Sequence, residues 1–200
     1  MSNSSKDEFV KTQIIEAAKT VFETYGFRKA SMGLIAEASK KGRSTLYYYY
    51  KNKEDVFKAC MFDLHKPLIK SCKLKLSNKN TLDKNLSIYV NEHIIYIENA
   101  LETYKIILND LRQGEDFISS VAVKIHQQDI EVIKDCLTWA IQNKEIETLD
   151  SEHINFLATS IVNTIDNTKK EFFIYETLKG DIQTKINWIN NLLIHSLKIK

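Results

Sequence analysis

The segment Arg43–Asp55 holds the densest group of side chains in the chain that could bind a polyanion. Four consecutive tyrosines, Tyr47–Tyr50, lie between Arg43 and the pair Lys51 and Lys53. Tyrosine hydroxyls and basic side chains donate hydrogen bonds to phosphates, and side chains on a short helix reach base edges in a DNA groove. A tyrosine-rich helix that only packs is the alternative. The segment therefore favours a nucleic-acid-binding helix.

The positive charge of the chain is concentrated around the same segment. The 200 residues carry a net charge of +2, but residues 28–53 contain seven basic residues and one acidic residue, Glu37. The rest of the chain is therefore net negative. A basic patch confined to one region is the expected footprint of nucleic-acid binding, although a solvated basic face gives the same pattern.

Composition favours a folded helical protein. Of the 200 residues, 44% are hydrophobic and 27% charged, with one proline and five glycines, which suits long helices. The cysteines, Cys60, Cys72 and Cys136, form no Cys-x-x-Cys pair, so reduced thiols are expected. The chain shows neither a signal peptide nor an apolar run of ~20 residues, so we expect a cytoplasmic protein without a membrane span.

Apolar spacing in the N-terminal region predicts a series of short helices. They are expected over residues 7–25, from near Ser31 to Ala38, over 43–50 and from Asn52 onward. Gly26 is expected to end the first helix, and Ser31 and Asn52 to act as N-caps. Residues 1–7 are expected to form a disordered tail. A short helix, a tight turn at 39–42 and another short helix make the helix-turn-helix pattern.

The third helix is expected to expose a polar and aromatic face. At ~100° per residue, Leu46 and Tyr50 share the inward face with part of Tyr49. The outward face would carry Ser44, Thr45 and Tyr48, with Tyr47 on the flank. A helix that only packs would show Lys and Glu there, so this face suits a reader of the major groove.

Longer amphipathic helices are predicted after Asn52. They are placed at 53–76 with a bend near Pro67, then 82–101, 103–112, 117–143, 151–177 and 182–198, with N-caps at Thr81, at Asp150 or Ser151, and at Asp181. The predicted fold is all-α: an N-terminal three-helix helix-turn-helix DNA-binding domain over 1–52, and a larger C-terminal helical bundle over 53–200 for effector binding and dimerisation.

The region Ile14–Phe57 resembles the N-terminal signature of the TetR (tetracycline-repressor-like) family of bacterial transcription regulators. The matching residues are Ile14, Ala17, Ala18, Phe22, Tyr25, Gly26, Phe27, Ser31, Ile35, Ala36, Thr45, Leu46, Tyr47, Tyr49, Tyr50, Lys51, Lys53, Glu54 and Asp55. The family turn often reads Ala-Gly-Val-Ser, whereas residues 39–42 read Ser-Lys-Lys-Gly. Lys41 therefore has to extend its charge towards solvent or DNA.

The resemblance implies a repressor that binds double-stranded operator DNA as a homodimer and is released by a small-molecule effector. Phosphate contacts would come from Ser31, Met32, Lys41, Tyr47 and Lys53, and the groove would be faced by Arg43, Ser44, Thr45 and Tyr48. The C-terminal helices would enclose the effector, and the last two would form a four-helix dimer interface. Effector binding would favour a state with a different spacing of the recognition helices.

Two other functions remain open on the sequence. A regulator of the same fold that responds to a protein partner would have a filled core in place of a cavity. A helical enzyme or binding module would show no salt-dependent DNA affinity. The chain has no His-Glu-x-x-His motif, no paired Glu-x-x-His, no glycine-rich phosphate loop and no Gly-x-Ser-x-Gly. We therefore expect no catalytic site, no metal and no cofactor.

Two further sets of residues are predicted from their positions on helices. Walls of a pocket for an apolar or aromatic ligand are expected at Tyr89, His93, Tyr96, Trp139 and Phe156, although such residues also fill cores. The last helix carries an apolar stripe at Ile186, Ile189, Leu193 and Leu197, widened by Trp188, Leu192 and Ile194. A stripe this wide needs two surfaces to bury it, which favours a dimer interface over a fully internal helix.

Overall fold

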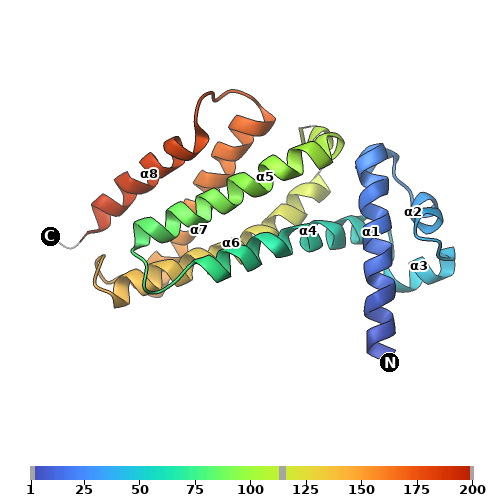
Figure 1. Ribbon diagram of the computed structural model, residues 1–200, viewed down its shortest axis with the longest axis horizontal. Coiled ribbons are helices and arrows are strands. Elements are labelled where there is room, and N and C mark those ends of the chain that lie inside the picture. The colour runs from blue at the N-terminus through green and yellow to red at the C-terminus, as the bar shows by residue number, and fades with distance from the viewer. Residues whose placement is uncertain (1–2, 113–115, 199–200) are drawn as a thin grey trace. The chain divides into compact units, whose positions relative to one another are not determined.

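The computed structural model describes the backbone of residues 3–112 and 116–198, and the side chains of 5–99, 120–121, 123–173 and 175–198. The helices are α1 (Asn3–Lys29), α2 (Met32–Ala38), α3 (Arg43–Tyr49), α4 (Lys53–Lys75), α5 (Leu82–Arg112), α6 (Asp116–Gln142), α7 (Ser151–Lys169), the π-helical turn η1 (Lys170–Ile174) and α8 (Ile182–Leu197) (Figure 1). The described residues contain no strand, so the predicted all-α class is confirmed. None of the described helices is long and apolar enough to span a membrane.

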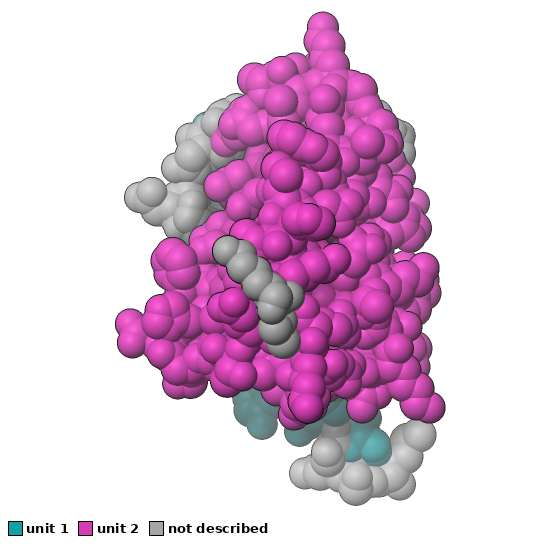
Figure 2. Space-filling view, turned by 90° about the vertical axis from the view of Figure 1, so that its left-hand side faces the viewer, with its two compact units in different colours: residues 1–66, 100–122 teal, residues 67–99, 123–200 magenta. Residues whose placement is uncertain are grey.

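The chain packs as two compact units, coloured separately in Figure 2. Unit 1 consists of residues 1–66 and 100–122, and unit 2 of residues 67–99 and 123–200. One division between them falls inside α4, immediately before Pro67. The boundary predicted between residues 52 and 53 divides the chain by function, into DNA binding and effector binding. The two units divide it by packing, so they do not test that boundary, and it stays a prediction.

In unit 1, α1 to α3 and the start of α4 share one apolar core. The rings of Phe22 and Phe27 each pack edge-on against the ring of Phe57. The centroid of Phe57 lies 5.1 Å from that of Phe22 and 5.0 Å from that of Phe27. Gly26 has φ 72° and ψ 170°, so the helix breaks there and Phe27 turns back into the core. The predicted end of the first helix at this glycine is thus confirmed.

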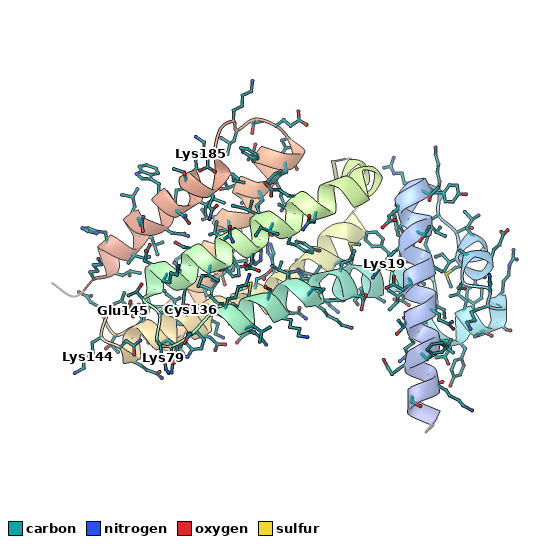
Figure 3. The ribbon with its side chains drawn as sticks, viewed as in Figure 1. Lys19, Lys79, Cys136, Lys144, Glu145 and Lys185 are labelled. Atoms are coloured by element: carbon teal, nitrogen blue, oxygen red, sulfur yellow. The ribbon has the colours of Figure 1, made fainter. Side chains whose placement is uncertain are left out.

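Polar contacts within unit 1 hold α1 at two points along its length. The Tyr49 hydroxyl donates to Asp7 Oδ1 at 2.7 Å, a contact between α3 and the start of α1. Further along, Lys19 Nζ lies 2.8 Å from both Glu16 Oε1 and Asp63 Oδ2, which joins α1 to α4 (Figure 3). The described part of the expected tail is therefore helical from Asn3, since Tyr49 supplies an anchor 42 residues away that local propensity does not reveal.

Unit 2 is built from the end of α4, the first part of α5, the later part of α6, and α7, η1 and α8. Their inward faces meet in a core whose largest fully buried members are Tyr89, Leu82, Leu86, Ile133, Leu137, Ile146 and Ile165. The loop after α6 closes on this core, because Glu145 accepts a hydrogen bond from the Leu82 backbone N–H at 2.8 Å (Figure 3).

Several helix starts lie where the sequence predicted them. The Asp150 side chain accepts from the His153 N–H, and Asp181 accepts from the N–H groups of Gln183 and Thr184. Thr81 and Asn52 cap α5 and α4 in the same way. The predicted break between residues 101 and 103 was wrong, because α5 runs unbroken to Arg112. No glycine or proline interrupts that stretch. Helix α7 ends at Lys169 and continues as η1, short of the predicted residue 177.

Candidate nucleic-acid interface

The exposed side of α3 carries two rows of side chains, each with members one helical turn apart. Arg43 and Tyr47 form the first row, and Ser44 and Tyr48 form the second. Tyr47 is 52% exposed and Tyr48 is 77% exposed, whereas Leu46 on the opposite side is fully buried. The predicted orientation of this helix is therefore what the structure has. Thr45, expected on the outward face, is only half-exposed.

The row of Arg43 and Tyr47 forms one wall of an open surface groove of about 540 Å³. The groove is lined by Ala30, Ser31, Met32, Gly33, Arg43, Tyr47, Lys51, Asn52 and Lys53. It brings together the residues for which phosphate contacts were expected, except Lys41, and adds Arg43 and Lys51. Hydroxyls and cations around an open groove are the donors that proteins use to bind DNA phosphates.

Gly33 shapes this groove, a role that sequence reasoning did not assign. A Cβ atom at Gly33 would lie 3.2 Å from Arg43 Nη2 and 3.8 Å from Arg43 Cζ. The guanidinium therefore lies against the backbone of α2 and inside the groove. The sequence does hold a signal, because glycine is costly inside a helix of only seven residues and its presence there needs a reason.

Lys53 is engaged by the protein itself. Its ammonium donates to the carbonyl oxygens of Phe27, Arg28 and Ala30 at 2.8, 3.2 and 3.3 Å, and lies 4.5 Å from the centre of the Phe27 ring. An ammonium has three N–H donors, so Lys53 caps the chain where it leaves α1. The predicted phosphate contact would require Lys53 to exchange one of these carbonyls for a phosphate oxygen.

The turn between α2 and α3 departs from the family pattern in its backbone as well as its residues. Lys40 adopts φ 54°, the left-handed conformation that favours glycine, at the position where the family turn often has one. Gly42 has an ordinary φ of −62°. Lys40 is exposed and Lys41 is half-buried, in keeping with the expectation that the stem of Lys41 covers the turn while its charge reaches outward.

The last two tyrosines of the run serve packing. The hydrogen bond to Asp7 raises the pKa of Tyr49 to about 12, and burial raises the pKa of Tyr50 to about 12. Both hydroxyls therefore keep their protons across the physiological range. Both rings pack against the unit 1 core, as predicted, and leave Tyr47 and Tyr48 as the tyrosines available to a partner.

In unit 2, two of the predicted pocket residues belong to a buried polar network. Tyr89 and His93 are each 1% exposed, with ring centres 3.9 Å apart. His93 Nδ1 donates to the Tyr89 carbonyl oxygen at 2.9 Å, and Nε2 lies 3.1 Å from Asp129 Oδ1. Burial, with help from the Asp129 charge, raises the pKa of Tyr89 well above its ordinary value. These polar groups are thus satisfied inside the unit.

A second polar group of unit 2 joins α6 to α7. Lys169 Nζ lies 2.5 Å from Asp166 Oδ1, and His126 Nε2 is hydrogen-bonded to Asp166 Oδ2. Burial alone would raise the pKa of Asp166, but the Lys169 charge and the His126 bond outweigh it and hold that pKa well below its ordinary range. An ionised carboxylate and a buried ammonium therefore lie together within unit 2.

The other predicted pocket residues lie in different surroundings. Tyr96 and Trp139 are half-buried and pack against the unit 2 core. Phe156 is 71% exposed, so its placement in an interior wall was wrong. It lies on the face of α7 opposite the buried residues Ala158 and Ile161, a distinction that mid-helix position alone does not make.

On α8, three of the four residues predicted to meet a second subunit face inward. Ile186 is fully buried, and Leu193 and Leu197 pack against the core of their own unit. Ile189 is half-exposed. The large apolar side chains on the outer face of this helix are Trp188, 64% exposed, and Leu192, 55% exposed. The strongest apolar stripe of α8 is therefore buried in the core of its own unit, and Trp188 and Leu192 are the large apolar side chains left exposed on the helix.

No cluster of three or more histidines, cysteines or carboxylates within the described part of the chain is arranged to hold a metal ion. The three cysteines, Cys60, Cys72 and Cys136, are buried thiols, and burial raises the pKa of each to about 12. They are therefore protonated and unreactive in the folded state.

Comparison with known proteins agrees with this geometry. Residues 14–60 match the family model described as bacterial regulatory proteins, tetR family. The chain is 24% identical over 189 residues to the fatty acid metabolism regulator protein of Bacillus subtilis (strain 168), covering 94% of this chain and 95% of that one.

Solved structures of such regulators share the fold. A putative TetR-family transcriptional regulator from Syntrophomonas wolfei superposes with a TM-score of 0.74 at 16% identity, covering 94% of this chain and 96% of that one. The transcriptional regulator FadR from Bacillus subtilis, in complex with stearoyl-CoA, gives a TM-score of 0.67 at 24% identity, covering 92% and 97%. With its helix-turn-helix, its basic groove and its helical second unit, the chain carries the N-terminal signature of the tetR family of bacterial regulatory proteins and shares the fold of solved TetR-family regulators.

Proposed function

We propose that the protein is a repressor that binds operator DNA as a homodimer and leaves it when a small-molecule effector binds. The observation that carries this proposal is the groove containing Arg43, Tyr47, Lys51 and Lys53 beside the outward row of α3. Phosphates held in the groove would fix the register of the protein on the duplex, while the neighbouring row faces the bases.

Release follows from a shift between two states of the dimer. In the DNA-binding state the two α3 helices would lie one helical turn of DNA apart, ~34–36 Å. An effector that binds better to a state with another separation lowers operator affinity by the ratio of its affinities for the two states.

Long-chain acyl-CoA is the effector class that we propose. FadR from Bacillus subtilis has been solved with stearoyl-CoA, and the chain matches that protein over nearly its whole length. An acyl chain also fits the expectation of an apolar ligand. Within unit 2, α5, α6 and α7 combine apolar residues with the charged groups of Asp166 and Lys169, which could receive the polar part of such a molecule.

The partner surface of the dimer is proposed to include Trp188 and Leu192. Replacing Leu192 with lysine should convert the dimer to a monomer, because a charge would enter an apolar contact. The matched control is Thr148→Lys, which adds the same charge at an exposed loop position. Sedimentation velocity would decide, and a Leu192→Lys protein that remains dimeric would remove this face from the interface.

The DNA-binding proposal is tested by fluorescence anisotropy with the DNA directly upstream of the gene, over a salt series. We expect tighter binding than to random DNA, with affinity falling steeply as salt rises. Lys51→Ala should weaken binding and reduce the salt slope by about 1, because one phosphate contact is lost. Lys79→Ala, an exposed lysine outside the groove, is the control. Equal affinity for random DNA, followed by a genome-wide selection without a motif, would refute the proposal.

The effector is tested in the same assay. Stearoyl-CoA should weaken operator binding at least tenfold, whereas CoA alone and stearate alone should leave it unchanged. Binding that stays tight at saturating stearoyl-CoA would reject acyl-CoA as the effector and leave the DNA-binding proposal in place.

A further inference from the structure

We propose that α3 recognises its operator chiefly through apolar contact between the Tyr48 ring and thymine methyl groups, and not through paired hydrogen bonds to guanine or adenine. The inference rests on the proposed function, since it requires operator DNA. It follows from the chemistry of the side chains that α3 presents, from the position of Arg43 and from the support beneath Tyr48.

Helix α3 lacks the side chains that read adenine by paired hydrogen bonds. Its sequence, Arg-Ser-Thr-Leu-Tyr-Tyr-Tyr, contains no asparagine or glutamine, whose amides bond to adenine N6 and N7. The outward row offers Ser44 and Tyr48. A serine hydroxyl bonds to either kind of base and discriminates weakly.

The one arginine of α3 lies in the groove and not in the outward row. Arg43 lies against Gly33, with its Nη2 atom 3.2 Å from where a Cβ of Gly33 would be. It shares a face of α3 with Tyr47 and lines the groove together with Ser31, Lys51 and Lys53. This position suits a phosphate contact, and in it the guanidinium does not lie in the row that would form paired bonds to guanine O6 and N7. The base-facing role expected for Arg43 is thereby replaced by a phosphate role.

Tyr48 is the large apolar surface that remains. It is 77% exposed, and its ring stands edge-on against Tyr49 with centroids 4.9 Å apart and planes at 87°. The Tyr49 hydroxyl is in turn bonded to Asp7 at 2.7 Å. The exposed ring therefore rests on an anchored ring, which limits the orientations it can take. The C5 methyl of thymine is the apolar group that the major groove presents to such a ring.

The experiment replaces single groups in the operator obtained by selection from random DNA. Each thymine is changed in turn to deoxyuridine, which removes only the methyl group, and each guanine to 7-deazaguanine, which removes only the N7 acceptor. We expect deoxyuridine to weaken binding roughly fourfold at one or more thymines of each half-site, the effect of removing one buried methyl. The 7-deazaguanine substitutions should change affinity less than twofold.

Protein variants then identify the side chain responsible. Tyr48→Ala should bind thymine and deoxyuridine operators equally, while Tyr48→Phe should keep the penalty, because the ring and not the hydroxyl makes the contact. Tyr25→Ala, at another exposed tyrosine of unit 1, should keep the penalty as well. Circular dichroism melting of each variant confirms that it is folded.

Other results of these experiments would overturn the inference. A deoxyuridine scan without effect on a selected operator would overturn the inference and leave the proposed function standing. So would a loss on 7-deazaguanine substitution that disappears in Arg43→Ala, or in a variant of any other basic residue. A selection that returns no motif would overturn both together.

Discussion

At the scale of single residues, the space left by Gly33 determines where the Arg43 guanidinium lies. A side chain at that position would meet the end of a flexible arginine and not the backbone, so the fold can accommodate it while the groove changes. DNA binding therefore favours glycine at this position, whereas helix stability favours a residue with a side chain.

We predict that Gly33→Ala will bind operator DNA roughly threefold to tenfold more weakly and will melt at the same or a higher temperature. Alanine is favoured over glycine in a helix by about 1 kcal/mol. The new Cβ would lie 3.2 Å from Arg43 Nη2, so the guanidinium has to shift within the groove by a few tenths of an ångström. Anisotropy and thermal melting measure the two effects. In an Arg43→Ala background the substitution should cost little further affinity. Wild-type affinity in Gly33→Ala alone would show that the position of Arg43 is unimportant.

Lys40 is the second residue with a conformational cost, because its φ of 54° is left-handed. This conformation costs a residue with a side chain about 1–2 kcal/mol, whereas glycine adopts it freely. Glycine, however, lowers the free energy of unfolding by about 0.4–1 kcal/mol, because it raises the conformational entropy of the unfolded chain. Lys40→Gly should therefore raise the free energy of unfolding by roughly 0.5–1 kcal/mol. Urea denaturation checks this against Lys41→Gly, which relieves no such strain and should destabilise.

At the scale of elements, the sequence predicts what depends on neighbouring residues along the chain. The N-caps at Ser31, Asn52 and Asp150 and the outward row of α3 follow from local spacing, and the structure has them. Contacts between distant segments do not follow from spacing. The bond from Tyr49 to Asp7 extends α1 beyond the start that local propensity indicates.

The α8 helix shows why part of the site was misplaced. Periodicity shows that an apolar stripe will be buried, but it does not show which surface buries it. Ile186 went to the core of its own unit, and the weaker flank with Trp188 and Leu192 stayed exposed. The contact of Arg43 with Gly33 and the hydrogen bonds of Lys53 likewise join different elements. The residue pattern of a single helix does not encode such contacts.

The junction between α1 and α2 is predicted to depend on the Lys53 ammonium. Lys53→Met keeps an apolar stem beside Phe27 but removes three hydrogen bonds, so we expect a loss of about 1–3 kcal/mol in unfolding free energy. Hydrogen exchange should also rise over residues 26–30. Lys51→Met is the matched control, because Lys51 is exposed in the same groove and should lose DNA affinity without losing stability. Unchanged stability in Lys53→Met would limit this residue to a role in DNA binding.

At the scale of the whole molecule, both units depend on carboxylates that are paired with lysines. Burial alone would raise the pKa values of Asp63, Glu92 and Asp166, but Lys19, Lys75 and Lys169 outweigh it and hold them below the ordinary 3.8 for Asp and 4.5 for Glu. The unfolded chain therefore binds these protons more readily than the folded chain does. Stability from these pairs is fully present above the ordinary values and is lost as the pH falls through the folded-state values.

We accordingly predict that the urea midpoint will fall as the pH drops below ~4. It should also decline between pH 7 and about pH 5, because burial lowers the pKa of His93 below its ordinary 6.5 and the unfolded chain takes up that proton more readily. Asp166→Asn should lower the midpoint at pH 7 and flatten the acid slope, because the lost carboxylate no longer takes up a proton on unfolding. A slope equal to that of the wild type would show that Asp166 titrates alike in the folded and unfolded chains.

The exposure of Trp188 gives the protein an optical reporter of its own. The chain has two tryptophans, and Trp139 is half-buried within unit 2 while Trp188 is 64% exposed. If the outer face of α8 meets a second copy, assembly removes water from the Trp188 indole and should shift its emission to shorter wavelength. Dilution of the unlabelled protein, with Trp188→Phe to isolate the Trp139 signal, would then yield the dimer dissociation constant from fluorescence alone.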